Sequence, residues 1–233
     1  MKNPAESRPP SPLSRLSSRE LCARRPDLAQ REPVLWQILQ AGLFLDESLR
    51  AELAAESRPL ACGAGCEACC HQQAIPMTLA EGMGICAFLR LAGLPVPERT
   101  ITDYLDGADR ARLKTSAPSA GEGLQQKVRG HKHDEVNRCP FLRDGCCTVY
   151  PVRPLACRRF LMFGRRCAYG EDTTRTRPED VFQPSPKKLF EALCLTLPVY
   201  ERLAVSVPAK VTRQFFYDHT HVIQAFPWHV ARR

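Results

Sequence analysis

Apolar residues recur at three- and four-residue spacings between Pro33 and about Ser57, and charged residues fall between them. A helix with one buried face has this period. We therefore predict an amphipathic helix over this stretch, with its apolar side in the core. The apolar positions are Leu35, Ile38, Leu39, Leu45, Leu49 and Leu53.

A second helix is predicted after Thr78, which forms a capping box with Glu81 three residues later. An apolar run follows, and Gly93 with Pro95 supplies the stop signal. Cys86 lies within the apolar run, so we interpret it as a small core residue.

Two further helices are predicted, one from Pro97 to about Lys114 and a final one from Pro186, with Ser185 as its N-cap. Cys194 lies in an apolar stretch of the final helix and is also expected in the core. The chain has no alternation of strands with helices and no glycine-rich phosphate loop. The predicted fold class is therefore mainly α.

Residues 1–32 are rich in Pro, Ser and Arg, and this composition buries too little apolar area to offset the entropy of ordering. We predict a disordered tail over residues 1–32 and a single folded domain over residues 33–233.

The 233 residues include twelve cysteines, which is more than core packing uses. Disulfides or metal ligation must account for most of them. The first residues contain no apolar run of the secretory type, and no apolar stretch is long enough to cross a bilayer. We therefore expect a cytoplasmic protein without a membrane partner, where a reducing environment favours metal ligation.

The formal net charge of +8 is typical of proteins that bind nucleic acid or anionic membranes. However, four thiolates around a divalent ion carry a charge of about −2, so two such sites would lower the net charge to about +4. We expect a weakly basic, solvated surface and no nucleic-acid partner.

The first cysteine motif reads CGAGCEACCH. Its spacing allows a short turn of backbone to point Cys62, Cys66 and Cys69 at one metal, at about 2.3 Å from each sulfur. Cys70 adds a fourth sulfur, which binds the same metal or a neighbouring one, or is simply buried. His71 abuts the motif and is a further candidate ligand.

The second motif, CPFLRDGCCTVYPVRPLAC, contains Cys139, Cys146, Cys147 and Cys157, and Cys167 follows ten residues later. Its prolines and glycine favour tight turns. Since about 70 residues separate the two motifs, we expect folding to bring their ligands together. The predicted architecture is a helical domain whose irregular cysteine-rich loops converge on a metal or iron-sulfur site. Cysteine-rich sets serve zinc and iron-sulfur clusters alike.

The order of the motifs, CxxxCxxCC followed by CPFL and then C-TVYPVRPLAC-R, resembles the YkgJ-like cysteine-cluster family of zinc- or iron-chelating domains. The resemblance covers about residues 60–170, which would be the motif core of a metal-binding domain over residues 33–233. Some relatives resemble flagellin lysine N-methylases, which implies a link to methyl transfer. Cys146 lies outside the family pattern. The expected metal ligands are Cys62, Cys66, Cys69, Cys70, Cys139, Cys147, Cys157 and Cys167.

Arg153 and Arg158 flank Cys157, where they could donate hydrogen bonds to thiolate or sulfide and offset the negative charge of the site. The alternative is that they form surface ion pairs, or that Arg153 fixes the turn. Pro154 is expected to start a short helical turn that presents Cys157.

Other side chains near the motifs are weaker candidates. His131 and His133 precede Cys139 in a charged loop and are expected to be exposed. Tyr150 and Phe141 are expected to pack over the site.

Several functional classes remain open. The first is a metal-binding protein of unassigned reaction, with zinc, iron or a cluster such as 4Fe-4S as cofactor. The second is a cluster-dependent enzyme, such as a protein lysine N-methylase or an oxidoreductase. The third is a zinc-stabilised module that binds a protein or nucleic acid, and metal storage or delivery is a further class. The spacing of Cys62, Cys66 and Cys69 also matches radical S-adenosylmethionine enzymes, but their βα barrel is not predicted here.

Overall fold

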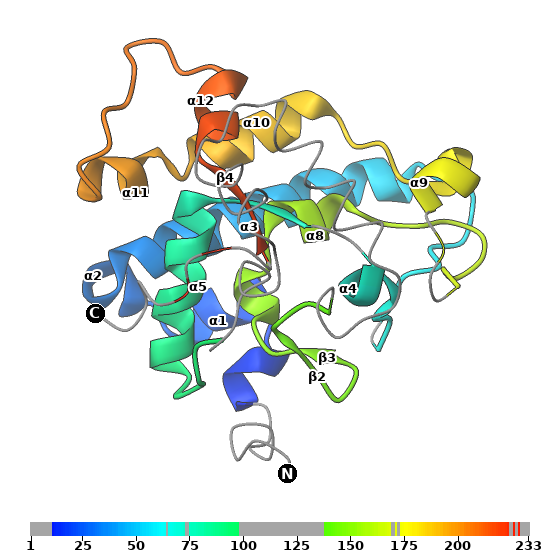
Figure 1. Cartoon of the computed structure of the whole chain (residues 1–233), viewed down its shortest axis with the longest axis horizontal. Helices are drawn as coiled ribbons and strands as arrows, with labels where there is room; N and C mark the ends of the chain where they lie inside the picture. The colour runs from blue at the N-terminus through cyan, green and yellow to red at the C-terminus, as the bar shows by residue number, and fades with distance from the viewer. Residues whose placement is uncertain are drawn as a thin grey trace, which may run out of the picture.

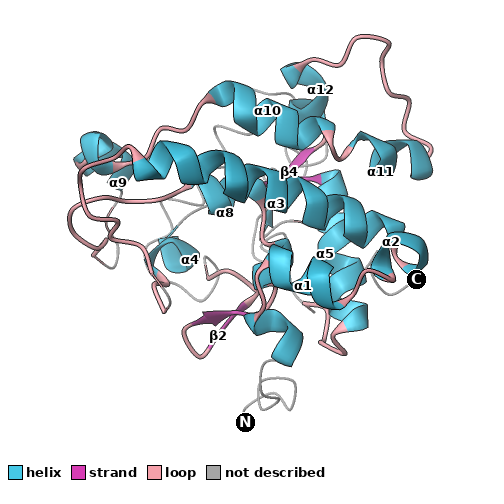
Figure 2. Ribbon diagram, turned by 180° about the vertical axis from the view of Figure 1, so that it is seen from behind, coloured by secondary structure: helices cyan, strands magenta, loops and turns pink. Residues whose placement is uncertain are grey.

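The helix predicted after Pro33 is present as α3 (Pro33–Ala54), and the other helices are arranged around it (Figure 1, Figure 2). The computed structural model describes residues 11–63, 65–72, 75–97, 138–168, 171, 173–223, 226 and 228. Within these residues the other α-helices are α1 (Ser18–Arg24), α2 (Leu28–Arg31), α4 (Ala68–Gln72), α5 (Leu79–Leu91), α8 (Leu155–Arg159), α9 (Thr173–Thr176), α10 (Pro186–Cys194), α11 (Leu197–Arg202) and α12 (Arg213–Asp218). The described part of the chain also contains the 3-10 helices η2 (Pro12–Arg15), η5 (Tyr150–Val152) and η6 (Pro178–Asp180). The prediction of a mainly helical fold is confirmed.

Short strands form two antiparallel pairs in the described residues. β1 (Pro76–Thr78) pairs with β4 (Thr220–Val222), and β2 (Leu142–Arg143) pairs with β3 (Cys146–Cys147). The first pair ties the start of α5 to the C-terminal part of the chain. The second is a hairpin inside the second cysteine motif.

α3 is the scaffold of the core. α1, α2, α5, α8 and α10 all pack against it, and its leucines Leu35, Leu39 and Leu45 are fully buried. α5 approaches α3 closely because Gly84 faces Ile38: an added Cβ would lie 2.3 Å from Ile38 Cγ1.

The helix predicted after Thr78 is α5, and both halves of its capping box form. The Glu81 backbone N–H donates to Thr78 Oγ1, and the Thr78 N–H donates to the Glu81 carboxylate over 2.7 Å. Gly93 ends the helix with a φ of 63°. Cys86 is 0% exposed, so its assignment to the core is confirmed.

The helix predicted from Pro186 is α10, with Ser185 at the N-cap position. It is not the final helix, because α11 and α12 follow it. Cys194 is half-buried at its end and packs against the core. The helix predicted from Pro97 and the loop containing His131 and His133 lie outside the described residues.

The prediction of a disordered tail is wrong for residues 11–32. This segment forms η2, α1 and α2, and it buries Leu21 and Leu28 completely. Ser17 and Glu20 form a capping box at the start of α1. Two serines anchor the segment to the second cysteine motif, since Ser14 Oγ donates to the Thr148 carbonyl and Ser18 Oγ donates to the Pro151 carbonyl over 2.6 Å.

Candidate metal centre

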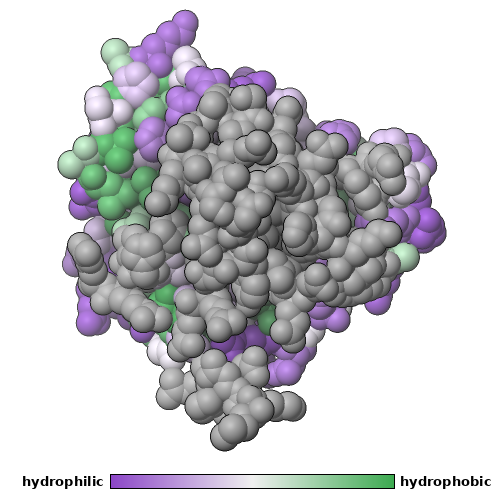
Figure 3. Space-filling view, in the orientation of Figure 1, coloured by the Kyte–Doolittle hydropathy of each residue, from purple (hydrophilic) through white to green (hydrophobic). Residues whose placement is uncertain are grey.

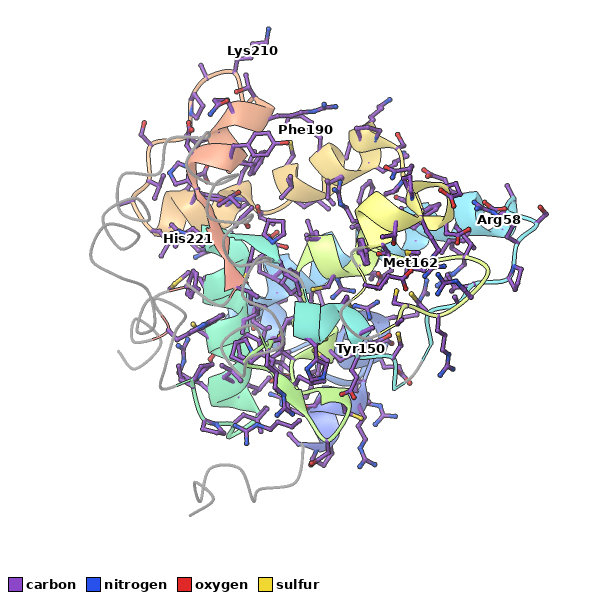
Figure 4. All side chains as sticks on the ribbon, turned by 45° about the vertical axis from the view of Figure 1, so that its right-hand side comes forward. Arg58, Tyr150, Met162, Phe190, Lys210 and His221 are labelled. Carbon is purple, nitrogen blue, oxygen red and sulfur yellow. The ribbon has the colours of Figure 1, made fainter. Side chains whose placement is uncertain are left out.

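The first cysteine motif is held beside the chain that follows Cys157. Leu60 and Phe163 form an antiparallel bridge, and the Ala61 N–H donates to the Met162 carbonyl over 2.7 Å. The Met162 N–H donates to Cys62 Sγ over 3.3 Å. The labelled Met162 marks this segment in Figure 4. Cys62 therefore already accepts one backbone hydrogen bond, as a metal-bound thiolate commonly does.

The rest of the motif forms a turn and a short helix. The Cys66 N–H donates to the Gly63 carbonyl, and Gly65 has a φ of 78°, which favours glycine. Cys69 and Cys70 then lie in α4. The segment is therefore not an irregular loop throughout, and the helical turn places these two thiols close enough to hydrogen-bond each other.

The two motifs meet through the backbone at Cys139, whose N–H donates to the Cys70 carbonyl over 2.7 Å. Residues 69 positions apart in the sequence are thereby adjacent in space. The β2–β3 hairpin follows, with Asp144 at φ 49° and Gly145 at φ 72°. Two central residues with positive φ are typical of the type I′ turn that joins strands by two residues.

The hairpin separates the two adjacent cysteines that it contains. Cys147 pairs with the buried Leu142, whereas Cys146 pairs with Arg143 and is exposed. Successive strand residues point to opposite faces. Only Cys147 therefore faces the interior.

Cys157 is carried by α8, whose N-cap is Pro154. The Leu155 N–H donates to Glu81 Oε1 over 2.6 Å, which fixes the start of α8 against the start of α5. The prediction that Pro154 starts a short helical turn is confirmed, except that the proline lies one position before the first helical residue.

Arg158 has partners other than a thiol. Its guanidinium group donates to Asp46 Oδ2 of α3 over 2.6 Å and to the carbonyl oxygens of Pro151 and Arg153. The residue is 3% exposed. Arg158 thus joins α8, η5 and α3, and its influence on the thiols is that of a nearby charge.

Arg153 is the other arginine expected to support the thiolates. Its guanidinium lies 4.3 Å from the centre of the Tyr150 ring. Its Nε is buried, and no hydrogen-bond acceptor reaches it among the residues that the structure describes. Hydrogen bonding with Cys70 raises the pKa of Cys69, and burial raises the pKa values of Cys147 and Cys157; the charge of Arg153 partly opposes each rise.

Cys167 lies next to a network of ion pairs. Arg177 Nε donates to Glu171 Oε1 over 2.8 Å, and Arg177 Nη1 donates to Asp180 Oδ2 over 2.8 Å. Arg165 pairs with the same Glu171 over 3.0 Å. These contacts hold the chain on both sides of Cys167.

The thiols of the second motif and of α4 perturb one another. The pKa of Cys157 is raised well above its ordinary value, first by burial and then by the thiols of Cys69, Cys147 and Cys70. Hydrogen bonding with the Cys139 thiol is the largest cause of the raised pKa of Cys70. Hydrogen bonding with Cys70 is the largest cause of the raised pKa of Cys69.

A second set of thiols surrounds Cys62. The pKa of Cys62 is raised to about 11, chiefly by burial and in part by the thiols of Cys66, Cys167 and Cys69. Burial also raises the pKa of Cys167, with Cys66 as the next cause. Without a cation, such thiols stay protonated at neutral pH.

The remaining cysteines have other neighbours. Burial raises the pKa values of Cys22, Cys86 and Cys194, and the side chains that perturb them further are Gln40, Arg90 and Glu191. Cys22 lies on α1, where Gln40 Nε2 donates to its Sγ over 3.5 Å. It is therefore part of the folded unit and not of a tail.

The thiols are neighbours without forming a preformed coordination sphere. Within the described ranges, no group of three or more His, Cys, Asp or Glu side chains has an arrangement that could hold a metal ion. The donor chemistry does fit zinc and iron, because both prefer thiolates. Since a thiolate must lose its proton to bind, metal binding here would be linked to proton release.

The other side chains near the motifs take structural positions. His71 lies on α4, with Nε2 3.5 Å from Glu67 Oε2. Phe141 is buried and packs edge-on against Trp228, with the ring centres 4.8 Å apart. Tyr150 is 40% exposed and stacks with Arg153, so it does not cover the thiols as a buried residue would.

No helix in the described part of the chain is long and apolar enough to cross a membrane.

No family model matches the sequence, and no curated protein or solved structure matches it either.

Proposed function

We propose that this chain is a cysteine-cluster metal protein whose thiolates bind zinc or iron, the latter as ions or as an iron-sulfur cluster. The observation that carries the proposal is which cysteine thiols influence one another. The eight cysteines expected to be ligands are electrostatic neighbours of one another, whereas Cys22, Cys86 and Cys194 have non-thiol neighbours and Cys146 faces outward. The resemblance of the two motifs to the YkgJ-like family favours the same ligand set.

Within this proposal the cysteine-rich segments converge on one side of the helical core. The hydrogen bond from Cys139 to Cys70 and the bridge between Leu60 and Phe163 support it, because each joins two segments that are distant in sequence.

We further propose that the ligands form two groups of four. Cys70, Cys139, Cys147 and Cys157 form an inner group around α4, the hairpin and α8. Cys62, Cys66, Cys69 and Cys167 form an outer group. Cys69 borders both groups, and we place it in the outer one because four cysteines complete a structural zinc site or a 4Fe-4S cluster.

Arg153 would support both groups. Its buried, unpartnered Nε can donate to a thiolate or sulfide, and its charge favours the deprotonated thiol. Bound zinc would supply a cross-link between the loops, whereas iron or an iron-sulfur cluster would supply one-electron chemistry.

The experiment is to count metal per chain in the wild type and three variants, each purified without oxygen. We expect Cys157→Ser and Cys167→Ser each to lose about half of the wild-type metal, because each removes one ligand from a different group. Cys86→Ala is the control and should keep all of it. Circular dichroism separates ligand loss from unfolding. If both serine variants kept the full metal content, the proposal would be wrong.

A further inference from the structure

A cavity of about 210 Å³ lies where α8, α10, α12 and the β1–β4 pair come together, in the upper part of Figure 1. Its wall is mainly apolar, and includes Met77, Leu155, Leu193 and the edge-to-face pair of Phe190 and Phe216, whose ring centres are 5.9 Å apart. Figure 4 labels Phe190 on this side of the molecule. An apolar cavity larger than about 150 Å³ can accept a benzene-sized body.

Two arginines line the same cavity. Arg159 at the end of α8 and Arg213 at the start of α12 are both exposed, and neither forms an ion pair with any residue that the structure describes. By contrast, Arg158 and Arg177 are each paired with a carboxylate. Since no described carboxylate competes for them, the two guanidinium groups are candidates to bind an anion from outside the chain.

Glu81 is the one acidic residue among the lining residues, and its carboxylate is already used. Oε2 accepts the hydrogen bonds from Thr78, and Oε1 accepts the 2.6 Å hydrogen bond from the Leu155 N–H. It holds α5 and α8 together and does not pair with either arginine. The lining groups thus carry two positive charges against at most one negative charge.

We propose that this cavity binds a small organic carboxylate with an apolar body about the size of one aromatic ring. The ring would lie against Phe190 and Phe216, and the carboxylate would lie at the mouth, where an arginine can bind it through two parallel hydrogen bonds. None of the eight proposed metal ligands lines the cavity, although Ala156, which does, directly precedes Cys157. The proposal therefore goes beyond metal binding and does not depend on it.

The test is calorimetric titration of the full chain, as purified, with 3-phenylpropionate and with its neutral amide. We expect saturable binding of one carboxylate per chain. Arg159→Gln and Arg213→Gln should each weaken binding about tenfold, the scale of a charged hydrogen bond. Arg202→Gln removes an exposed arginine outside the cavity and should bind as the wild type does. The amide should bind the wild type and the double arginine variant equally.

Carbon-13 labelling of the methionine methyl groups locates the ligand. The Met77 signal should shift on titration, because Met77 lines the cavity, while the signal of the buried Met162 should not. The proposal is overturned if the carboxylate does not bind at 10 mM, if both arginine variants bind as the wild type does, or if Met77 is unaffected. Metal content is measured on the same samples, so failure of this proposal is distinct from failure of the metal proposal.

Discussion

Cys146 and Cys147 are adjacent in the chain but have opposite environments. The register of the β2–β3 hairpin places Cys147 opposite the buried Leu142 and Cys146 opposite Arg143. Burial raises the pKa of Cys147, so its thiol needs a cation to lose its proton at neutral pH. The pair is therefore a matched comparison of a proposed ligand with a free thiol.

We predict that Cys147→Ser releases metal and that Cys146→Ser keeps the full content. Serine is a poorer donor to zinc and iron than thiolate, and the remaining thiolates of the group would repel one another. Metal analysis of the two variants at equal protein concentration provides the measurement. Equal metal content in both would contradict the assignment of Cys147 as a ligand.

Arg153 should set the pH range over which metal is held. Its charge partly offsets the raised pKa values of Cys69, Cys147 and Cys157, so Arg153→Met should raise these pKa values further. Because protonation of the thiolates competes with metal, the variant should release metal at a higher pH than the wild type as the solution is acidified. Arg202→Met controls for the loss of one exposed arginine. If the pH at which half of the metal is released were the same as in the wild type, Arg153 would not act on the site.

At the scale of elements, α3 and α5 could be predicted because their apolar period, capping box and stop signals are local. The N-terminal helices were missed because they have little apolar surface of their own, and because Ser14 and Ser18 bond to carbonyl groups more than 130 residues away. The capping box of Ser17 and Glu20 was a sequence signal from which the start of α1 could have been predicted. The Asp144-Gly145 pair was likewise an unused signal for the two-residue hairpin that separates the adjacent cysteines, of which only a tight turn was predicted.

The Arg158 side chain can pass over α3 because Gly42 has no side chain at this point. A Cβ at this position would lie 2.7 Å from Arg158 Cζ. The guanidinium cannot move away without losing its bonds to Asp46 and Pro151. We expect Gly42→Ala to destabilise the protein by about 2 kcal/mol, measured by urea unfolding. At Gly63 an added Cβ has open space, so Gly63→Ala should change the stability by less than about 0.5 kcal/mol. If Gly42→Ala and Gly63→Ala changed the stability equally, the close contact of Gly42 with Arg158 would not be the cause.

The segment around Cys167 should lose stability in acid through Glu171. Hydrogen bonding from Arg177 lowers the pKa of Glu171 from its ordinary 4.5 to about 2. A carboxyl whose folded pKa is depressed contributes stability that is fully present above its unfolded pKa and is lost as the pH falls through the folded value. The melting temperatures of the wild type and Glu171→Gln should therefore differ most above pH 4.5 and converge towards pH 2.

Glu201→Gln is the control for this comparison, since the exposed Glu201 forms no ion pair with another described residue. Acid also releases metal from each protein. The quantity to compare is therefore the difference between the melting temperatures of the wild type and each variant. A difference that stayed constant between pH 7 and pH 2 would exclude Glu171 as its source.

For the whole molecule, the helices act as a frame that holds the cysteine segments. Arg158 joins α8 to α3, Glu81 joins α5 to α8, and Cys139 is bonded to Cys70. The motifs and their resemblance to a known family gave the candidate ligands but not these contacts, because each connects residues that are far apart in sequence. Hydrophobic residues gather over α11, at the left of Figure 3 and away from the cysteine segments in Figure 1.

Metal binding by the eight thiols is tested most directly by metal analysis and a visible absorption spectrum of protein purified without oxygen. We predict a stoichiometric metal content, with zinc giving a colourless protein and iron or an iron-sulfur cluster giving a coloured one. Removal of the metal by a chelator should lower the melting temperature, since site formation and folding share one free energy. A chain that is purified free of metal and binds none when zinc or ferrous iron is added, yet is fully folded, would contradict the account.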